Sequence, residues 1–139
     1  GDLTSMIASE WLGQEVAVSS QYVAYEGKPV ECEIDPSYSY DEAVLMITDS
    51  QNEIIYQEAL DADQARYIWD GELSSGSDKA SEGVYQFQVD LFSEGQQIAS
   101  VPPQVVSTVT ALGNEKGQMR VGTDSHLSAN LSDVRKIEP

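Results

Sequence analysis

The sequence has very few of the residues on which most catalytic and metal centres depend. Its 139 residues include one cysteine, Cys32, and one histidine, His126. One cysteine excludes an internal disulfide, and one of each residue cannot form a Cys/His zinc site unless carboxylates complete it. Cys32 alternates with Val30 and Ile34, which predicts a thiol buried in a core rather than a reactive one. We therefore assign no catalytic residue, no metal ligand and no cofactor site.

The chain also lacks the short motifs of the common catalytic and binding sites. There is no glycine-rich phosphate loop and no Cys-x-x-Cys pair. His126 lies in the polar stretch TDSHLSAN, so an exposed loop histidine is favoured over a Ser-His-Asp arrangement. The acidic stretches DSQNE and LDADQA lack the EF-hand pattern, which leaves calcium as a lesser alternative. Carboxylate pairs for glycoside hydrolysis remain open, because 24 acidic residues always offer pairs and no signal selects one.

Basic residues are scarce as well. Seven Lys and Arg face 24 Asp and Glu, which gives a net charge of −17. Nucleic acids and anionic membrane surfaces are therefore unsuitable partners. The acidic residues are spread along the chain, which indicates a solvated surface; a salt-tuned or cation-dependent assembly surface is the alternative. No apolar run approaches the roughly 20 residues of a membrane span, so membrane insertion is not expected. The abrupt start at Gly1-Asp2 leads us to expect a segment upstream.

Apolar spacing predicts one short helix at the start of the chain and β-structure after it. Leu3, Met6, Ile7 and Trp11 fall at helical spacing, and Gly13 suits a helix stop. Beyond it, strands and turns recur about every 8–12 residues, which is typical of a sandwich or a barrel.

The strand pattern divides the chain into a middle and two flanks. Residues 27–101 can hold about seven short strands, enough for a sandwich. Residues 15–25 and 104–137 each hold too few strands to be stable alone. We expect these two flanks to pair with each other around the middle unit.

Five segments, in the right order, give the chain a family resemblance. They are WLGQEV (11–16), VLMITDSQNEII (44–55), WDGELSSG (69–76), GVYQFQV (83–89) and VGTDSHLSANLSDVRKI (121–137). Together they resemble the C-terminal core of the bacterial flagellar hook-capping proteins, also called hook assembly scaffold or basal-body rod modification proteins. The family's recurring positions are matched here by Trp69, Asp70, Gly71, Gly83, Tyr85, Phe87, Leu131, Val134 and Ile137.

The resemblance implies an all-β fold in which one unit is inserted into another. A fibronectin-III- or immunoglobulin-like sandwich would interrupt a small tudor-like β-barrel, with a short N-terminal helix in front. Residues 1–26 would supply the helix and the first part of the barrel, residues 27–103 the sandwich, and residues 104–139 the rest of the barrel. Trp69 would then end a sandwich strand with its ring in the core. Asp70-Gly71 would turn the chain, because aspartate bonds its own backbone and glycine permits positive φ. A ligand-binding tryptophan is the alternative.

The resemblance also implies a function without catalysis. Such proteins cap the distal end of the growing hook, promote the assembly of hook protein subunits, and arrive through the flagellar type III export apparatus. Partners would be hook subunits and further copies of the chain, as a pentamer that depends on a segment upstream of Gly1. The alternative is an immunoglobulin-like module of an adhesin or of a secretion-linked appendage. An enzyme is a third reading, which dependence of an activity on one carboxylate would revive.

Overall fold

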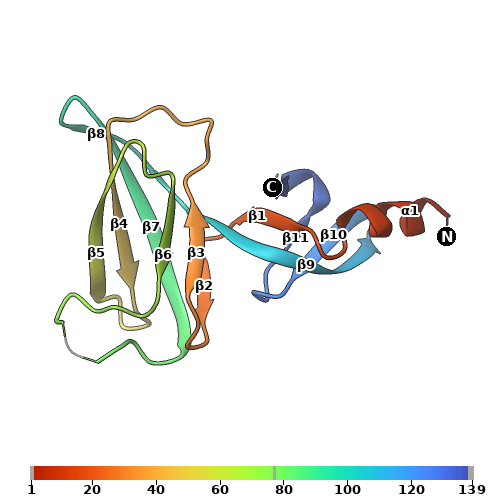
Figure 1. The fold of residues 1–139 in the computed structure, drawn as a ribbon, viewed down its shortest axis with the longest axis horizontal. Coiled ribbons are helices and arrows are strands. Elements are labelled where there is room, and N and C mark those ends of the chain that lie inside the picture. Colours follow the sequence, from red (N-terminus) through yellow and green to blue (C-terminus); the bar gives the residue numbers. More distant parts are fainter. Residues whose placement is uncertain (1, 77, 138–139) are drawn as a thin grey trace.

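The computed structural model describes residues 2–76 and 78–137, with side chains from residue 5 onward. Gly1, Ser77, Glu138 and Pro139, and the side chain of Leu3 in the predicted helical stripe, lie outside the described part. Figure 1 shows one part built from β2 to β8 and a second part that holds α1, β10 and β11. The long strand β9 runs from the first part into the second.

The chain is almost entirely β-structure after one N-terminal helix. Helix α1 (Asp2–Trp11) ends before Gly13, whose φ of +81° suits the residue after a helix. No helix in the described ranges is long and apolar enough to cross a membrane. The elements that follow are β1 (Glu15–Ser19), β2 (Tyr22–Tyr25), β3 (Val30–Glu33), β4 (Glu42–Thr48), β5 (Ile54–Asp61), β6 (Arg66–Trp69), β7 (Gly83–Ser93), β8 (Gln96–Val101), β9 (Gln104–Glu115), β10 (Gln118–Thr123), β11 (Ser128–Asn130), the 3-10 turn η1 (Leu131–Asp133) and β12 (Arg135–Lys136).

Two sheets face each other in the first part. One has the order β2-β7-β4-β5, and β8 pairs with the second half of β7. The other contains β6 and β3, and β3 continues onto the start of β9 through the pair Cys32↔Val105. All these pairings are antiparallel. The predicted all-β class is therefore confirmed, with an immunoglobulin-like sandwich as the first part.

The two flanks pair with each other, as the strand count led us to expect. Strand β1 lies between β9 and β12, with Val16 opposite both Ser107 and Lys136. The expectation fails for β2, which lies within residues 15–25, the first flank. This strand pairs with β7 over residues 83–86 and so completes a sandwich sheet. The break between the two parts therefore falls between β1 and β2.

Tight hairpin turns occur at two positions with positive φ. Glu94-Gly95 joins β7 to β8, and Lys116-Gly117 joins β9 to β10. Two successive residues with positive φ form the type I′ turn that suits the twist of paired strands. Strand β9 extends through Glu115 and leaves only two residues for its turn into β10.

Each part of the molecule has a hydrophobic core of its own. The larger core fills the sandwich and includes Trp69, Phe87, Leu45 and Cys32, all at most 1% exposed. The smaller core lies in the second part, around Val16, Val18, Val109 and Val121. Leu127 contacts both cores, so the loop before β11 joins the two parts.

Candidate functional site

The Trp-Asp-Gly loop is built on an aromatic cluster in the sandwich core. Trp69 is 1% exposed, and its ring lies 5.0 Å from Tyr25, 5.5 Å from Tyr85 and 5.6 Å from Phe87, measured between centroids. The two partners on β7, Tyr85 and Phe87, meet it edge to face, a favourable geometry for aromatic rings. The indole Nε1 donates a hydrogen bond to the carbonyl of Glu72 at 2.9 Å. A buried ring with a satisfied N–H leaves no free face for a ligand.

Asp70 and Gly71 turn the chain directly above this cluster. The Asp70 carboxylate accepts hydrogen bonds from Lys79 Nζ at 2.9 Å and from the Tyr25 hydroxyl at 3.2 Å. The hydrogen bond from Lys79 lowers the pKa of Asp70 below its ordinary value. Gly71 has a φ of +79°, and a Cβ placed there would lie 2.6 Å from the Tyr25 hydroxyl oxygen. Glycine is therefore required at this position on two independent grounds, backbone conformation and space.

Tyr85 fixes the entry into β7. Its hydroxyl donates to the carbonyl of Ser81 at 2.6 Å, four residues upstream. Such a tyrosine, which bonds back to the backbone before its own strand, is a known feature of immunoglobulin-like sandwiches. Phe87 follows two residues later on the same inward face and is 1% exposed. Gly83 begins the strand in ordinary extended backbone, and a Cβ there would meet nothing within 4 Å. Nothing in the structure explains why residue 83 is a glycine.

The closing segment lies in the second part, away from the Trp-Asp-Gly loop. Leu131 and Val134 pack against the smaller core. Ile137 is half-buried, and its N–H donates to the carbonyl of Glu15 at 2.9 Å. The motif residues therefore form two groups, one in each part, rather than one constellation.

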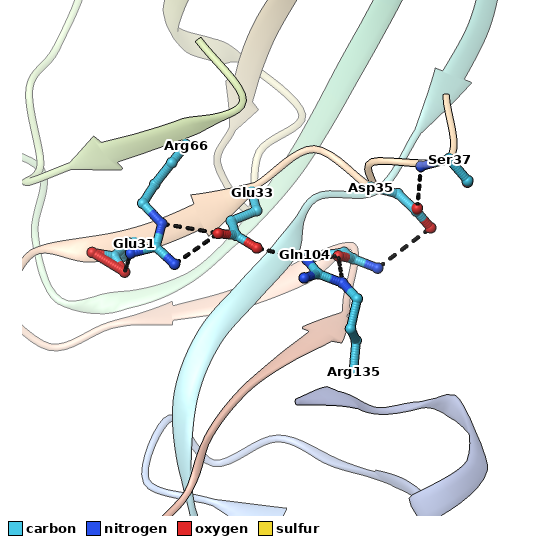
Figure 2. A network of polar contacts seen from close by, with 7 residues as sticks. All are labelled: Glu31, Glu33, Asp35, Ser37, Arg66, Gln104 and Arg135. Carbon is cyan, nitrogen blue, oxygen red and sulfur yellow. Dashed lines mark hydrogen bonds and ion pairs between the residues drawn. The ribbon is translucent and has the colours of Figure 1, made fainter. Parts of the chain in front are cut away.

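A polar network that sequence reasoning missed joins these two parts (Figure 2). Arg135 on β12 donates from one nitrogen to Glu33 on β3 and to Gln104 on β9, each at 2.6 Å. Glu33 also binds Arg66 on β6, at 2.7 Å. Gln104 continues the network to Asp35 at 3.4 Å. Arg135 and Glu33 are 102 residues apart in the chain, and no local pattern signals such a contact.

The charges within this network are mutually satisfied. Burial alone would raise the pKa of Glu33, but hydrogen bonds from Arg135 and Arg66 outweigh it and hold the pKa below its ordinary value. A hydrogen bond from the backbone N–H of Ser37 lowers the pKa of Asp35. Glu33 keeps only 17% of its side chain exposed. The network is thus a structural joint between β3, β6, β9 and β12.

The remaining candidates for chemistry lie apart from one another. Burial raises the pKa of Cys32 to about 12, so this fully buried thiol is neither ionised nor reachable. The His126 side chain is 68% exposed and contacts Glu26 at 3.1 Å. Within the described residues, no group of three or more His, Cys, Asp or Glu is placed to hold a metal ion.

The match to known proteins decides the family. The FlgD Ig-like domain family matches residues 19–95. The chain belongs to the FlgD Ig-like domain family. No curated protein matches the sequence.

Solved FlgD structures share the fold over nearly the whole chain. FlgD from Xanthomonas campestris, whose structure is described as giving insights into the hook capping essential for flagellar assembly, superposes with a TM-score of 0.78 at 16% identity. That match covers 96% of this chain and 98% of the other. FlgD from P. aeruginosa gives a TM-score of 0.69 at 18% identity and covers 91% and 97%. The FlgD-like arrangement therefore includes the second part of the chain as well as the sandwich.

Proposed function

We propose that this protein is a non-enzymatic scaffold that caps the growing bacterial flagellar hook and promotes the assembly of hook subunits. Membership of the FlgD Ig-like domain family carries the proposal. The partners would be hook protein subunits and further copies of the chain in the cap. Its place would be the distal end of the hook, reached through the flagellar type III export apparatus.

The pairing of the two flanks supports this proposal over an isolated adhesin module. A module that works alone has no need for its first and last strands to meet, yet β1 pairs with both β9 and β12. We propose the corresponding division into an inserted sandwich and a discontinuous tudor-like barrel, with the first boundary between β1 and β2. No described feature favours the adhesin alternative.

The described residues also support a scaffold rather than an enzyme. The Trp-Asp-Gly loop and the joint around Arg135 hold parts of the fold together, and each of their charged groups has a partner. A cap must form contacts that are later released, which suits a wet, polar surface better than a large apolar one.

Deletion of the gene in the bacterium that encodes it tests the function directly. We expect cells without hooks that release hook subunits into the medium, and recovery of hooks when the intact gene is returned. The control is a gene that encodes Ile68→Ala, an exposed position whose side chain lies on the opposite face of β6 from Trp69, which should restore hooks fully. Hooks of normal length in the deletion strain would contradict the proposal.

A further inference from the structure

One face of this acidic molecule carries charged side chains in only one half. It is the outward face of the sheet β2-β7-β4-β5, the side turned away from the sandwich core. One row crosses all four strands through the pairs Ile54↔Thr48, Thr48↔Gln86 and Gln86↔Tyr22. The next row contains Met46, Gln57 and Gln88. None of these seven side chains is charged, although the chain carries −17 overall.

Exposed apolar side chains gather at one end of this face. Tyr22 and Val84 are each 59% exposed and lie on neighbouring strands, and Ile54 is 54% exposed on β5. Three carboxylates occur toward the other end of the face. Glu42 and Asp61 lie opposite each other, whereas Asp90 is 9% exposed and accepts a hydrogen bond from Gln88 at 2.9 Å. An exposed tyrosine and a half-buried methionine, Met46, with few charges around them match the composition that distinguishes the centre of a protein interface.

A hollow beside Gln88 is likewise lined by uncharged residues. It has a volume of about 250 Å³. It lies beside the middle of β7, between the stretch of β7 that pairs with β2 and the stretch that pairs with β8. Its lining includes Gln21, Gln88 and Ser100, and none of its lining residues is charged. A second hollow, lined by residues of β2, β3 and β9, differs because its lining includes Glu15, Glu26 and further charged residues.

The opposite sheet provides the comparison within the sandwich. Ile68 on β6 is 57% exposed, much like Val84. Its cross-strand partner is Glu31, however, and Arg66 and Glu33 pair two residues further along the same two strands. An equally exposed apolar side chain therefore lies among charges on one sheet and among uncharged side chains on the other.

We propose that the outward face of β2-β7-β4-β5 is the surface through which this chain associates with a second copy of itself. A basic partner would be drawn to the acidic surface that covers the rest of the molecule. A partner that carries −17 itself is repelled there and can approach closely only where charge is missing. Two copies that use the same patch form an isologous, two-fold contact. The proposal concerns this contact alone and does not depend on the hook-cap function.

The charges around this face lead us to expect a weak contact that strengthens with added salt. Charges around the rim, such as Glu42 and Asp61 at the end of the sheet, repel across the interface. Added salt screens them, so association should strengthen as salt rises, opposite to an interface built from attractive ion pairs.

Sedimentation velocity with one pair of matched variants tests the proposal. Val84→Glu and Ile68→Glu add the same charge at nearly equal exposure on opposite sheets. We expect wild type to form a dimer that tightens between about 0.02 M and about 0.5 M NaCl. Val84→Glu should weaken the dimer by about tenfold or more, while Ile68→Glu leaves it near wild type. Tyr22→Glu repeats the test from a second strand, and thermal unfolding shows that each variant is folded.

Three results would overturn the proposal. The first is a wild-type chain that stays monomeric at about 1 mM in high salt, a concentration that detects even very weak pairs. The second is an equal loss of association in Val84→Glu and Ile68→Glu, because net charge alone would then explain it. The third is a Val84→Glu variant that dimerises normally but no longer binds purified hook subunits, which would assign the face to the hook subunit.

Discussion

Trp69 is the residue around which the sandwich core is arranged, because three further aromatic rings from β2 and β7 surround it. Trp69→Ala should lower the free energy of unfolding by about 3–5 kcal/mol, since it removes a large buried side chain and leaves a cavity. Chemical denaturation measures this. Ile68→Ala, one residue earlier and 57% exposed, is the matched control and should change stability by less than about 1 kcal/mol. Equal midpoints for Trp69→Ala and wild type would revive the ligand-binding reading of this tryptophan.

A comparison of Gly71 with Gly76 separates two causes of instability in a Gly→Ala variant, a steric clash of the new Cβ and the strain of a left-handed backbone. Both have positive φ, +79° and +73°, but only at Gly71 would a Cβ collide with Tyr25; at Gly76 it meets nothing within 4 Å. Gly76→Ala should cost about 1–2 kcal/mol from the left-handed backbone alone. Gly71→Ala should cost clearly more in the same denaturation measurement. A smaller loss at Gly71 than at Gly76 would show that the loop shifts away from Tyr25 freely.

For single residues, the sequence predicted the structural role, such as a buried strand position or a turn, better than it predicted which other residues each one contacts. Alternation around Tyr85 and Phe87 gives the inward face of a strand, and the Trp-Asp-Gly sequence gives a turn. Neither pattern tells which strand lies opposite. The contact of Tyr25 with Asp70 and Gly71 joins segments 45 residues apart, and so it could only be found in the structure.

At the scale of elements, the joint around Glu33 should make stability depend on pH. The pKa values of Glu33 and Asp35 are lowered in the fold. A carboxyl group with a lowered pKa stabilises the fold above its unfolded pKa, and this stabilisation is lost as pH falls through the folded value. Wild type should therefore lose stability below pH 4.5, the ordinary pKa of a glutamate.

The variant Glu33→Gln isolates this effect from the general titration of the acidic surface. It should be less stable than wild type at pH 7, because Arg66 and Arg135 lose a charged partner, and the two proteins should converge in stability as pH falls. Urea denaturation at a series of pH values measures the difference. Glu31→Gln, which changes a glutamate whose only described ion pair is a 3.3 Å contact with Arg66, is the control. A difference that stays constant from pH 7 to acid would exclude the role of the Glu33 charge.

Truncation distinguishes the two early strands, β1 and β2, which both lie within residues 15–25. Removal of residues 107–139 takes away β10, β12 and most of β9, but keeps Val105 in the larger core. Residues 15–17 should then lose amide protection, while β2 stays protected through its pairing with β7. Hydrogen exchange reads both strands in one experiment. Protection that persists at residues 15–17 would show that β1 does not need the closing segment.

The sequence predicted these elements well where short-range patterns define them. The hairpin of β4 and β5 and the strands β6 to β8 follow from alternation and from turn residues. The partner of β2 did not follow, because Tyr22-Val23-Ala24-Tyr25 has the same alternation whether it pairs with a flank or with the sandwich. Which strand pairs with β2 depends on residues that are far from β2 in the sequence.

At the scale of the whole molecule, the charge of −17 acts against the folded state. Folding brings like charges closer together, and salt screens their repulsion. The unfolding temperature at pH 7 should therefore rise by a few degrees between about 0.02 M and about 0.3 M NaCl. Scanning calorimetry measures it, and sucrose of equal osmolality controls for the exclusion of solutes from the surface. A fall in unfolding temperature with salt would mean that the attractive network around Arg135 outweighs the repulsion.

The position of β1 between β9 and β12 also fixes the order in which the chain can fold. Its pair Val16↔Lys136 closes a loop of about 120 residues, one of the most entropically demanding contacts the chain can make. The sandwich is closed by shorter loops and can form while β1 still lacks both neighbours. A chain that emerges from its N-terminus would thus carry β1 unpaired until β9 is free, and would leave its other edge open until β12 follows. The second part then assembles last, on a sandwich that already holds the start of β9 in place.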